Sequence, residues 1–148
     1  MSKRISFKGS LAEGLEEKIK LSTLNGKRGY KIIKFETMNS APGAGSYETI
    51  TKVYSKTQGS GSTTVDFTEG DLIAVNYIED GGAVTNGPAS TQTMIFDNEV
   101  FNQDIFVTTA STQGTNPTNY YIELETVALT DIQATQLTLK NLRIIASR

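Results

Sequence analysis

The sequence alternates apolar and polar residues in short segments, and this two-residue period constrains the fold more than any other feature. The clearest case is NYYIELETVALTD, residues 119–131. In it Ile122 and Leu124 share one parity, and Glu123 and Glu125 share the other. A period of two is typical of a β-strand with one buried face. We therefore expect Ile122 and Leu124 in a core and the two glutamates exposed on the solvent side.

Seven other segments carry strand-like patterns and are separated by turn-forming residues. They are Arg4–Lys8, Glu16–Leu21, Tyr30–Met38, Glu48–Ser55, Asp71–Ile78, Thr91–Phe96 and Asp104–Thr109. The chain has 13 Gly but only 3 Pro, and β-branched residues between turn formers favour an all-β domain. About eight strands in 148 residues predict a single β-sandwich or jelly-roll domain over residues 1–148.

Two segments require a choice of face or of structure. In residues 30–38 we expect Ile33, Phe35 and Thr37 to share the core-facing side. Asp131 can cap a short helix over 131–143, because suitable residues recur there at helical spacing. Those residues are Ile132, Thr135, Leu139 and Leu142. The alternation of Leu137 with Leu139 also allows a loop followed by a strand, and we favour the helix.

The composition excludes several classes of function. Cys, His and Trp are absent, so the chain has no disulfide, no thiol chemistry and no histidine general base. With 14 basic and 16 acidic residues and a pI of about 5.2, it has no basic field for nucleic acid. No apolar run is long enough to span a membrane or to act as a signal peptide, so we expect the protein to stay in the cytoplasm of the cell that makes it.

Glu123 and Glu125 are the candidates for catalysis. Residues two apart on a strand lie about 6.6 Å apart along it, near the carboxyl separation of about 6.5–9.5 Å in inverting glycosidases. Any two alternating acids meet this criterion, and acids opposite an apolar face are usual on a half-solvated strand. We therefore expect a protein that is not an enzyme. A glycoside hydrolase would require an activity that Glu123→Gln abolishes.

Acidic and glycine-rich turns are the candidates for metal and phosphate binding. Asp97, Glu99 and Asp104 could offer oxygen ligands to Ca²⁺, although they lack the spacing of an EF-hand. Gly43–Gly45 and Gly59–Gly61 are not followed by the Lys-Ser/Thr of a phosphate-binding loop, so we expect turns there. We expect neither a metal nor a cofactor.

Five segments occur in an order that resembles a known group of proteins. They are RISFKG, GYKIIKFETM, DLIAVNYIED, DNEVFNQDIFVTTAS and NYYIELETVALTDIQATQLTLKNLR. Together they resemble small virion structural proteins of tailed bacteriophages, particularly marine ones, and most of all capsid decoration (cement) proteins. The resemblance implies a β-sandwich without catalytic residues, often a trimer. Such a protein binds the major capsid protein on the outside of the head and stabilises the shell.

The N-terminal segment is the expected contact with the capsid. The first fifth of the chain is mildly basic, and charge complementarity can steer it to an acidic surface. Its basic residues include Lys3, Arg4, Lys8, Lys18 and Lys20. We expect residues 1–8 to form an arm that orders on binding and can be deleted without loss of the fold. Its contact residues would be Lys3, Arg4, Ile5 and Lys8. The Gly-rich segment Asp80–Ser90 is a second candidate arm, or a surface tip.

A carbohydrate-binding module on a tail or fibre is the alternative. β-Sandwiches commonly bind host glycans, and tyrosine rings could serve as platforms. The tyrosines are Tyr30, Tyr47, Tyr54, Tyr77, Tyr120 and Tyr121. The absence of Trp counts against this alternative. Labelling of intact particles distinguishes the two functions, because a cement protein covers the head and an attachment module lies on the tail.

Overall fold

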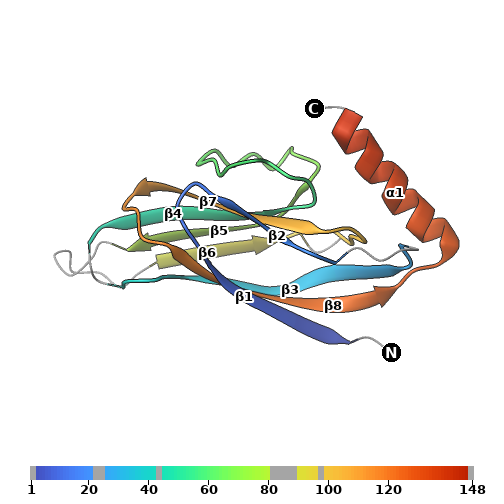
Figure 1. Cartoon of the computed structure of the whole chain (residues 1–148), viewed down its shortest axis with the longest axis horizontal. Helices are drawn as coiled ribbons and strands as arrows, with labels where there is room; N and C mark the ends of the chain where they lie inside the picture. The colour runs from blue at the N-terminus through green and yellow to red at the C-terminus, as the bar shows by residue number, and fades with distance from the viewer. Residues whose placement is uncertain (1–2, 22–25, 43–44, 81–89, 97–98, 147–148) are drawn as a thin grey trace.

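The chain folds into a sandwich of two antiparallel sheets with one helix outside them (Figure 1). The computed structural model describes residues 3–21, 26–42, 45–80, 90–96 and 99–146. The elements are β1 (Arg4–Leu11), β2 (Glu16–Ile19), β3 (Arg28–Asn39), β4 (Tyr47–Tyr54), β5 (Leu72–Asp80), β6 (Ser90–Ile95), β7 (Ile105–Gln113), β8 (Thr118–Ala128) and α1 (Asp131–Ala146). The smaller sheet has the order β1-β8-β3 and the larger β2-β7-β4-β5-β6. This confirms the predicted all-β sandwich of about eight strands with a C-terminal helix.

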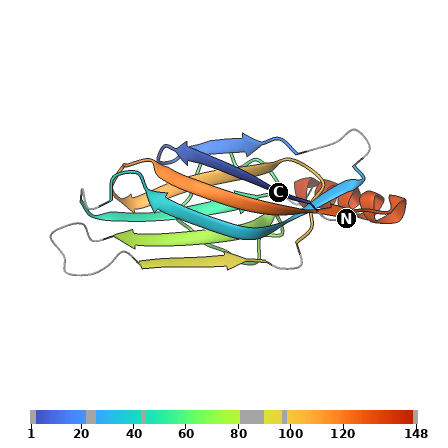
Figure 2. The same ribbon diagram turned by 90° about the horizontal axis from the view of Figure 1, so that it is seen from below.

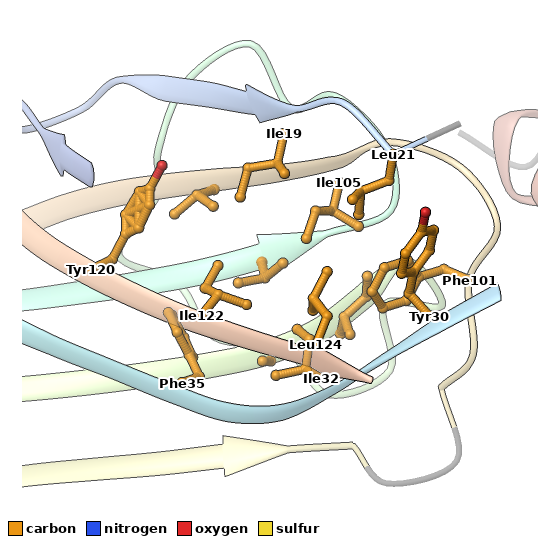
Figure 3. Close-up of a cluster of buried hydrophobic side chains, with 14 of the residues drawn as sticks. Ile19, Leu21, Tyr30, Ile32, Phe35, Phe101, Ile105, Tyr120, Ile122 and Leu124 are labelled. Carbon is orange, nitrogen blue, oxygen red and sulfur yellow. The ribbon is translucent and has the colours of Figure 1, made fainter. Parts of the chain in front are cut away.

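β8 is the central strand of the smaller sheet and supplies the middle of the core (Figure 3). It pairs with β1 on one side and with β3 on the other. Its alternation directs Tyr120, Ile122 and Leu124 between the sheets, where each is at most 4% exposed. There they join one buried cluster with Phe35 of β3 and Ile105 of β7. Ile122 and Leu124 are therefore core residues, as predicted.

A β-bulge in β3 changes the predicted core face of that strand. Ile32 and Lys34 pair with consecutive residues of β8, so Ile33 is an extra residue between them. Ile32 and Phe35 are both buried, whereas Ile33 and Thr37 are only half-buried. The prediction that Ile33 and Phe35 share the core face is wrong, because an extra residue shifts the phase of the alternation by one.

The larger sheet is covered on its outer face as well as on its inner face. Residues 56–70, called the outer loop below, cross the outer face of β4 (Figure 1). They bury Lys52 of β4, whose Nζ donates a hydrogen bond to the carbonyl oxygen of Thr64 at 2.6 Å. Gly61 passes so close to the backbone of Thr109 that a Cβ there would lie 1.8 Å from the Thr109 carbonyl oxygen. Only glycine allows this approach.

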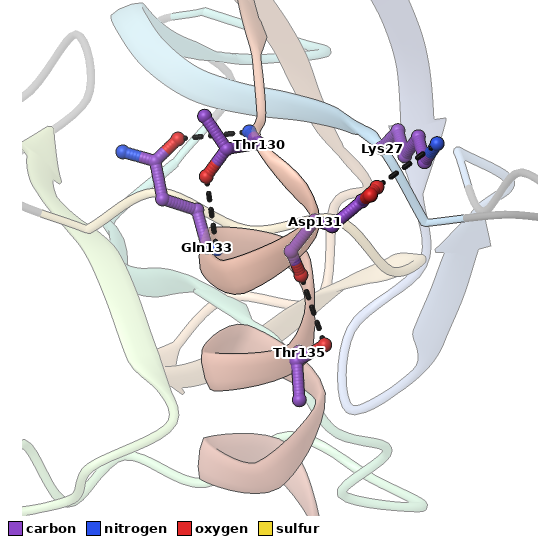
Figure 4. Close-up of polar contacts among 5 residues, drawn as sticks. All are labelled: Lys27, Thr130, Asp131, Gln133 and Thr135. Carbon is purple, nitrogen blue, oxygen red and sulfur yellow. Dashed lines mark hydrogen bonds and ion pairs between the residues drawn. The ribbon is translucent and has the colours of Figure 1, made fainter.

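α1 begins with a capping box one residue earlier than predicted (Figure 4). The Thr130 hydroxyl accepts a hydrogen bond from the Gln133 N–H at 3.2 Å, and the Gln133 side chain accepts one from the Thr130 N–H at 3.0 Å. The cap is therefore Thr130 and not Asp131. Asp131 lies in the first turn, where its carboxylate suits the helix dipole and pairs with Lys27 at 2.9 Å. The predicted helix is confirmed, and its predicted cap is wrong.

Candidate functional site

The predicted contact arm is part of the smaller sheet. β1 begins at Arg4, and the backbone of Lys3 already bonds to β8. Beyond its first two residues, which lie outside the described residues, the segment is an edge strand and not a free arm. Ile5 and Phe7 of this strand pack against the core. Deleting residues 1–8 would therefore damage the fold, contrary to the prediction.

The four predicted contact residues do not share one face of β1. Lys3, Arg4 and Lys8 are exposed, whereas Ile5 is half-buried and packs on the core. Arg4 and Lys8 project from the outer face of the smaller sheet, because alternate residues of a strand point to the same side. Of the four predicted contact residues, the three cations are exposed and open to a partner.

Glu123 and Glu125 lie on the same outer face and are half-buried rather than exposed. Arg4 Nη1 lies 3.5 Å from Glu123 Oε1, and Lys31 Nζ lies 3.9 Å from Glu125 Oε1. The side chains of Glu123 and Glu125 are 20% and 27% exposed. Each carboxylate pairs with a cation on a neighbouring strand, as is usual on a charged sheet face. These pairs turn the basic N-terminal segment into a surface of mixed charge.

The carboxylates predicted as calcium ligands bind neighbouring elements. Glu99 pairs with Lys140 of α1 at 2.9 Å. Asp104 accepts a hydrogen bond from the Leu21 N–H at 2.7 Å and lies 3.3 Å from Lys18 Nζ. Across the described part of the chain, no group of three or more acidic side chains is placed to hold a metal. Glu99 and Asp104 therefore have structural roles at two different places.

Three predicted features fall wholly or partly outside the described residues. They are Asp97, the Gly43–Gly45 turn and the Gly-rich segment Asp80–Ser90, of which only the end residues belong to strands. Gly59–Gly61 is described and lies in the outer loop, where Gly59 has a φ of 80°. A positive φ of this kind is typical of a glycine turn, as predicted.

Four of the six tyrosines predicted as ring platforms are core residues. Tyr30, Tyr47, Tyr54 and Tyr120 are each at most 5% exposed. Tyr77 and Tyr121 are half-buried. A glycan could therefore use only two of the six rings without opening the core.

Three large apolar side chains are exposed together on the outer face of the larger sheet. Val65 and Phe67 come from the outer loop and Met94 from β6, and they are 41%, 54% and 46% exposed. They border a hollow of about 240 Å³. Its other lining residues are Ile50, Val75, Tyr77 and Gln92, from β4, β5 and β6. We call Val65, Phe67 and Met94 the outer patch.

Contacts within the outer loop and with the sheet hold the outer patch in place. The Phe67 ring packs edge-to-face on Phe96, with 5.2 Å between the ring centroids. Asp66 accepts hydrogen bonds from the Thr68 hydroxyl at 2.6 Å and the Thr68 N–H at 2.9 Å, and these bonds lower the pKa of Asp66. Beneath the loop, burial lowers the pKa of Lys52. The patch is thus a fixed part of the surface.

The outer patch is not among the sites predicted from the sequence. Its signal lies in STTVDFTEG, where Val65 and Phe67 alternate with polar residues. Large apolar residues in a polar, Gly-rich loop are unusual, because loops are normally polar. Met94 could be found only from the sheet order, since β6 must pair with β5 before Met94 can reach the loop.

A second concave surface lies where the smaller sheet does not cover β6. β6 extends past the edge of β3 (Figure 2), and a groove of about 740 Å³ follows that edge. Its lining contains a polar network. The Thr37 hydroxyl donates to the Asn76 side-chain oxygen, and the Asn76 amide donates to Thr93 Oγ1 at 2.7 Å. These polar side chains bond to one another within the fold. We therefore interpret the groove as a gap between two sheets of unequal width and not as a binding site.

The remaining surface element is α1. It is not long and apolar enough to cross a membrane, and it is the only helix in the part of the chain that the structure describes. Its contacts with the sandwich include the Lys27–Asp131 and Lys140–Glu99 ion pairs. Comparisons of the chain with known protein-family models and with curated proteins found no match.

Proposed function

We propose that this chain is a non-enzymatic structural protein of a phage particle. It binds the major capsid protein on the outside of the head and stabilises the shell. The outer patch is the observation that supports a binding role best. A protein that works by contact needs apolar surface that its own fold leaves uncovered, and such clusters mark interaction sites. The order of its segments, which resembles that of virion structural proteins, supports the phage particle as its location.

The outer patch has the composition of an interface centre. Phe67 and Met94 belong to residue types that are enriched at interfaces, and the hollow beside them can receive an apolar side chain of the partner. Gln92 lines the same hollow and can supply a polar contact. Since the ring of Phe67 is already fixed against Phe96, binding costs little side-chain entropy there.

The cations of the N-terminal segment form the second candidate contact. Lys3, Arg4 and Lys8 are exposed, but Arg4 already pairs with Glu123. Charges at the rim of an interface change the association rate more than the affinity. Arg4 and Lys8 also belong to the outer face of the smaller sheet, on the opposite side of the sandwich from the outer patch. One flat capsid surface cannot contact both, so variants can separate them.

Immunogold labelling of intact particles tests the proposed location. The antibody is raised against this chain, and the particles are imaged by electron microscopy. Label spread evenly over the head is the expected result. Label confined to the tail would contradict capsid binding and favour host attachment, and label on no particle would contradict both.

Binding to heads that lack this protein tests the proposed contact. Met94→Glu puts a charge into the outer patch, and Thr91→Glu puts the same charge on the opposite, exposed face of β6 as a matched control. We expect Met94→Glu to bind at least about tenfold more weakly and Thr91→Glu to bind like the wild type. A third variant, with Lys3, Arg4 and Lys8 all changed to Glu, should associate more slowly. If this variant no longer bound the heads and Met94→Glu bound like the wild type, the capsid contact would lie at the N-terminal cations and not at the outer patch.

A carbohydrate-binding module of a tail or fibre is the second candidate, and Tyr77 is the residue that favours it. Its half-buried ring lines the hollow of the outer patch beside the Gln92 amide. An apolar ring face beside a polar group suits a sugar. Retention on a glycan array that is lost in Tyr77→Ala and kept in Tyr121→Ala would support this function.

A further inference from the structure

α1 is apolar on two opposite sides, and one side is covered by the sandwich. On the covered side, Ala134 is only 7% exposed. Leu137 and Lys140 border a small hollow with Val100, which lies just before β7 in the chain. Lys140 also pairs with Glu99 at 2.9 Å. These contacts fix one face of the helix against the end of the sandwich.

The other side of α1 carries a stripe that the fold leaves exposed. Ile132, Leu139 and Leu142 are 72%, 50% and 56% exposed, and Thr135 lies on the same side. At 3.6 residues per turn, this stripe lies about 180° around the helix from the covered side. Figure 1 shows α1 outside both sheets, so a partner can approach it from the side away from the sandwich. We call the four residues the α1 stripe.

The spacing of the α1 stripe is that of a helix–helix seam. Its residues are separated by three, four and three positions, the spacing of the a and d positions of a coiled coil. Side chains at this spacing interlock with those of a second helix that has the same spacing. Thr135 fits such a seam because its hydroxyl already bonds to the Asp131 carbonyl oxygen at 2.9 Å, which leaves its methyl group for packing. The occupant that fits the stripe is therefore a helix.

The partner helix that fits the stripe is α1 of another copy of this chain. The stripe carries no charge. Among the residues that flank it, Gln136 and Thr138 in the middle are neutral. The charged Asp131 and Arg143 lie at its two ends. Helices that select a different partner use charges at these flanking positions to repel self-pairing. The middle of α1 lacks that repulsion, and a symmetric arrangement brings the same apolar residues of each copy together.

We propose that this chain self-associates through the α1 stripe, with the helices of neighbouring copies packed side by side. This inference goes beyond the proposed function, because it depends on neither the particle nor the surface that the protein binds. Three large apolar side chains on a helix of about 24 Å make a small interface, so association is weak in solution. It becomes stronger where copies are held at a high local concentration, as on a lattice.

Sedimentation equilibrium of the full chain, from about 5 µM to about 500 µM, tests the proposal. Leu139→Lys puts a charge in the middle of the α1 stripe. Leu15→Lys makes the same change at a leucine that is 54% exposed, between β1 and β2, and is the matched control. We expect the wild type and Leu15→Lys to associate alike. Leu139→Lys should associate at least about tenfold more weakly.

Circular dichroism first establishes that both variants are folded. A wild-type chain that stays monomeric over the whole concentration range would overturn the proposal. Undiminished association of Leu139→Lys, or equal loss in both variants, would overturn it as well. None of these results bears on where the antibody label lies on the particle, so the two proposals succeed or fail separately.

Discussion

β8 and α1 follow one another in the chain, yet they use their apolar residues in opposite ways. In β8, Ile122 and Leu124 are 0% exposed. In α1, Ile132 is 72% exposed and Leu139 is 50% exposed. Residues 129–130 alone separate the two elements. Local apolar content therefore does not decide which of the two elements is buried.

The difference follows from the neighbours of each element. β8 has a strand on each side and a second sheet across its inner face, so the monomer completes its burial. α1 rests on the end of the sandwich along one side only, and its other apolar side stays in water. A strand of the first kind stabilises the fold, and a helix of the second kind is available for assembly. Substitutions can therefore separate stability from association.

The largest expected effect is the truncation of a leucine in β8. Leu124→Ala leaves a cavity in the core, and we expect the free energy of unfolding to fall by about 2–5 kcal/mol. Leu139→Ala removes the same atoms from an exposed site, so its free energy of unfolding should stay within about 0.5 kcal/mol of the wild type. Urea unfolding at low protein concentration measures both. Equal losses would show that α1 belongs to the core after all.

The next effect concerns a polar contact at the edge of the same core. The Tyr120 hydroxyl of β8 donates to the Glu17 carboxylate of β2 and so joins the two sheets. Tyr120→Phe removes this bond, and we expect the free energy of unfolding at neutral pH to fall by about 1–2 kcal/mol. Tyr121→Phe is the matched control, because that hydroxyl bonds to Glu123 at 3.2 Å on the outer face. We expect Tyr121→Phe to lower the free energy of unfolding by less than Tyr120→Phe does.

The same variant has a pH dependence whose sign follows from the Tyr120 pKa. Burial, together with the bond to Glu17, raises the pKa of Tyr120 above its ordinary value of 10.0. Above pH 10 the unfolded chain loses this proton and the folded chain keeps it, so wild-type stability falls as the pH rises. The advantage of the wild type over Tyr120→Phe should then shrink by up to about 1.4 kcal/mol per pH unit. If the difference in free energy of unfolding between the wild type and Tyr120→Phe stayed constant from pH 8 to pH 11, the raised pKa of Tyr120 would be contradicted.

β8 could be predicted from the sequence because its alternation and its burial coincide. Ile122 and Leu124 face the core, and the acids between them face outward, as a half-buried strand requires. The presence of α1 could be predicted from the helical spacing of Ile132 and Leu139. That this side of the helix faces away from the sandwich could not, because it depends on how Ala134 meets the sandwich.

The features that sequence analysis missed depend on contacts between distant segments. The extra residue Ile33 is defined only by its register with β8. The outer patch needs Phe67 of a loop to meet Met94 of a strand, through a sheet order that no local pattern specifies. The N-terminal segment looks like a free arm until its pairing with β8 makes it an edge strand. The local periodicity of the sequence predicts individual strands and helices. Predicting a surface site also requires knowing how those strands and helices are arranged.

The smallest expected effect lies at Thr130, between the two elements. Thr130→Ala removes the acceptor for the Gln133 N–H, and we expect the start of α1 to lose about 1 kcal/mol of local stability. Amide hydrogen exchange across α1 and β8 measures this loss, and Thr130→Ser, which keeps the hydroxyl, should match the wild type. Faster exchange in α1 alone would mean that the helix opens independently of the sandwich. Equally faster exchange in β8 would mean that helix and sandwich open as one unit, and the contrast between an assembly helix and a core strand would not hold.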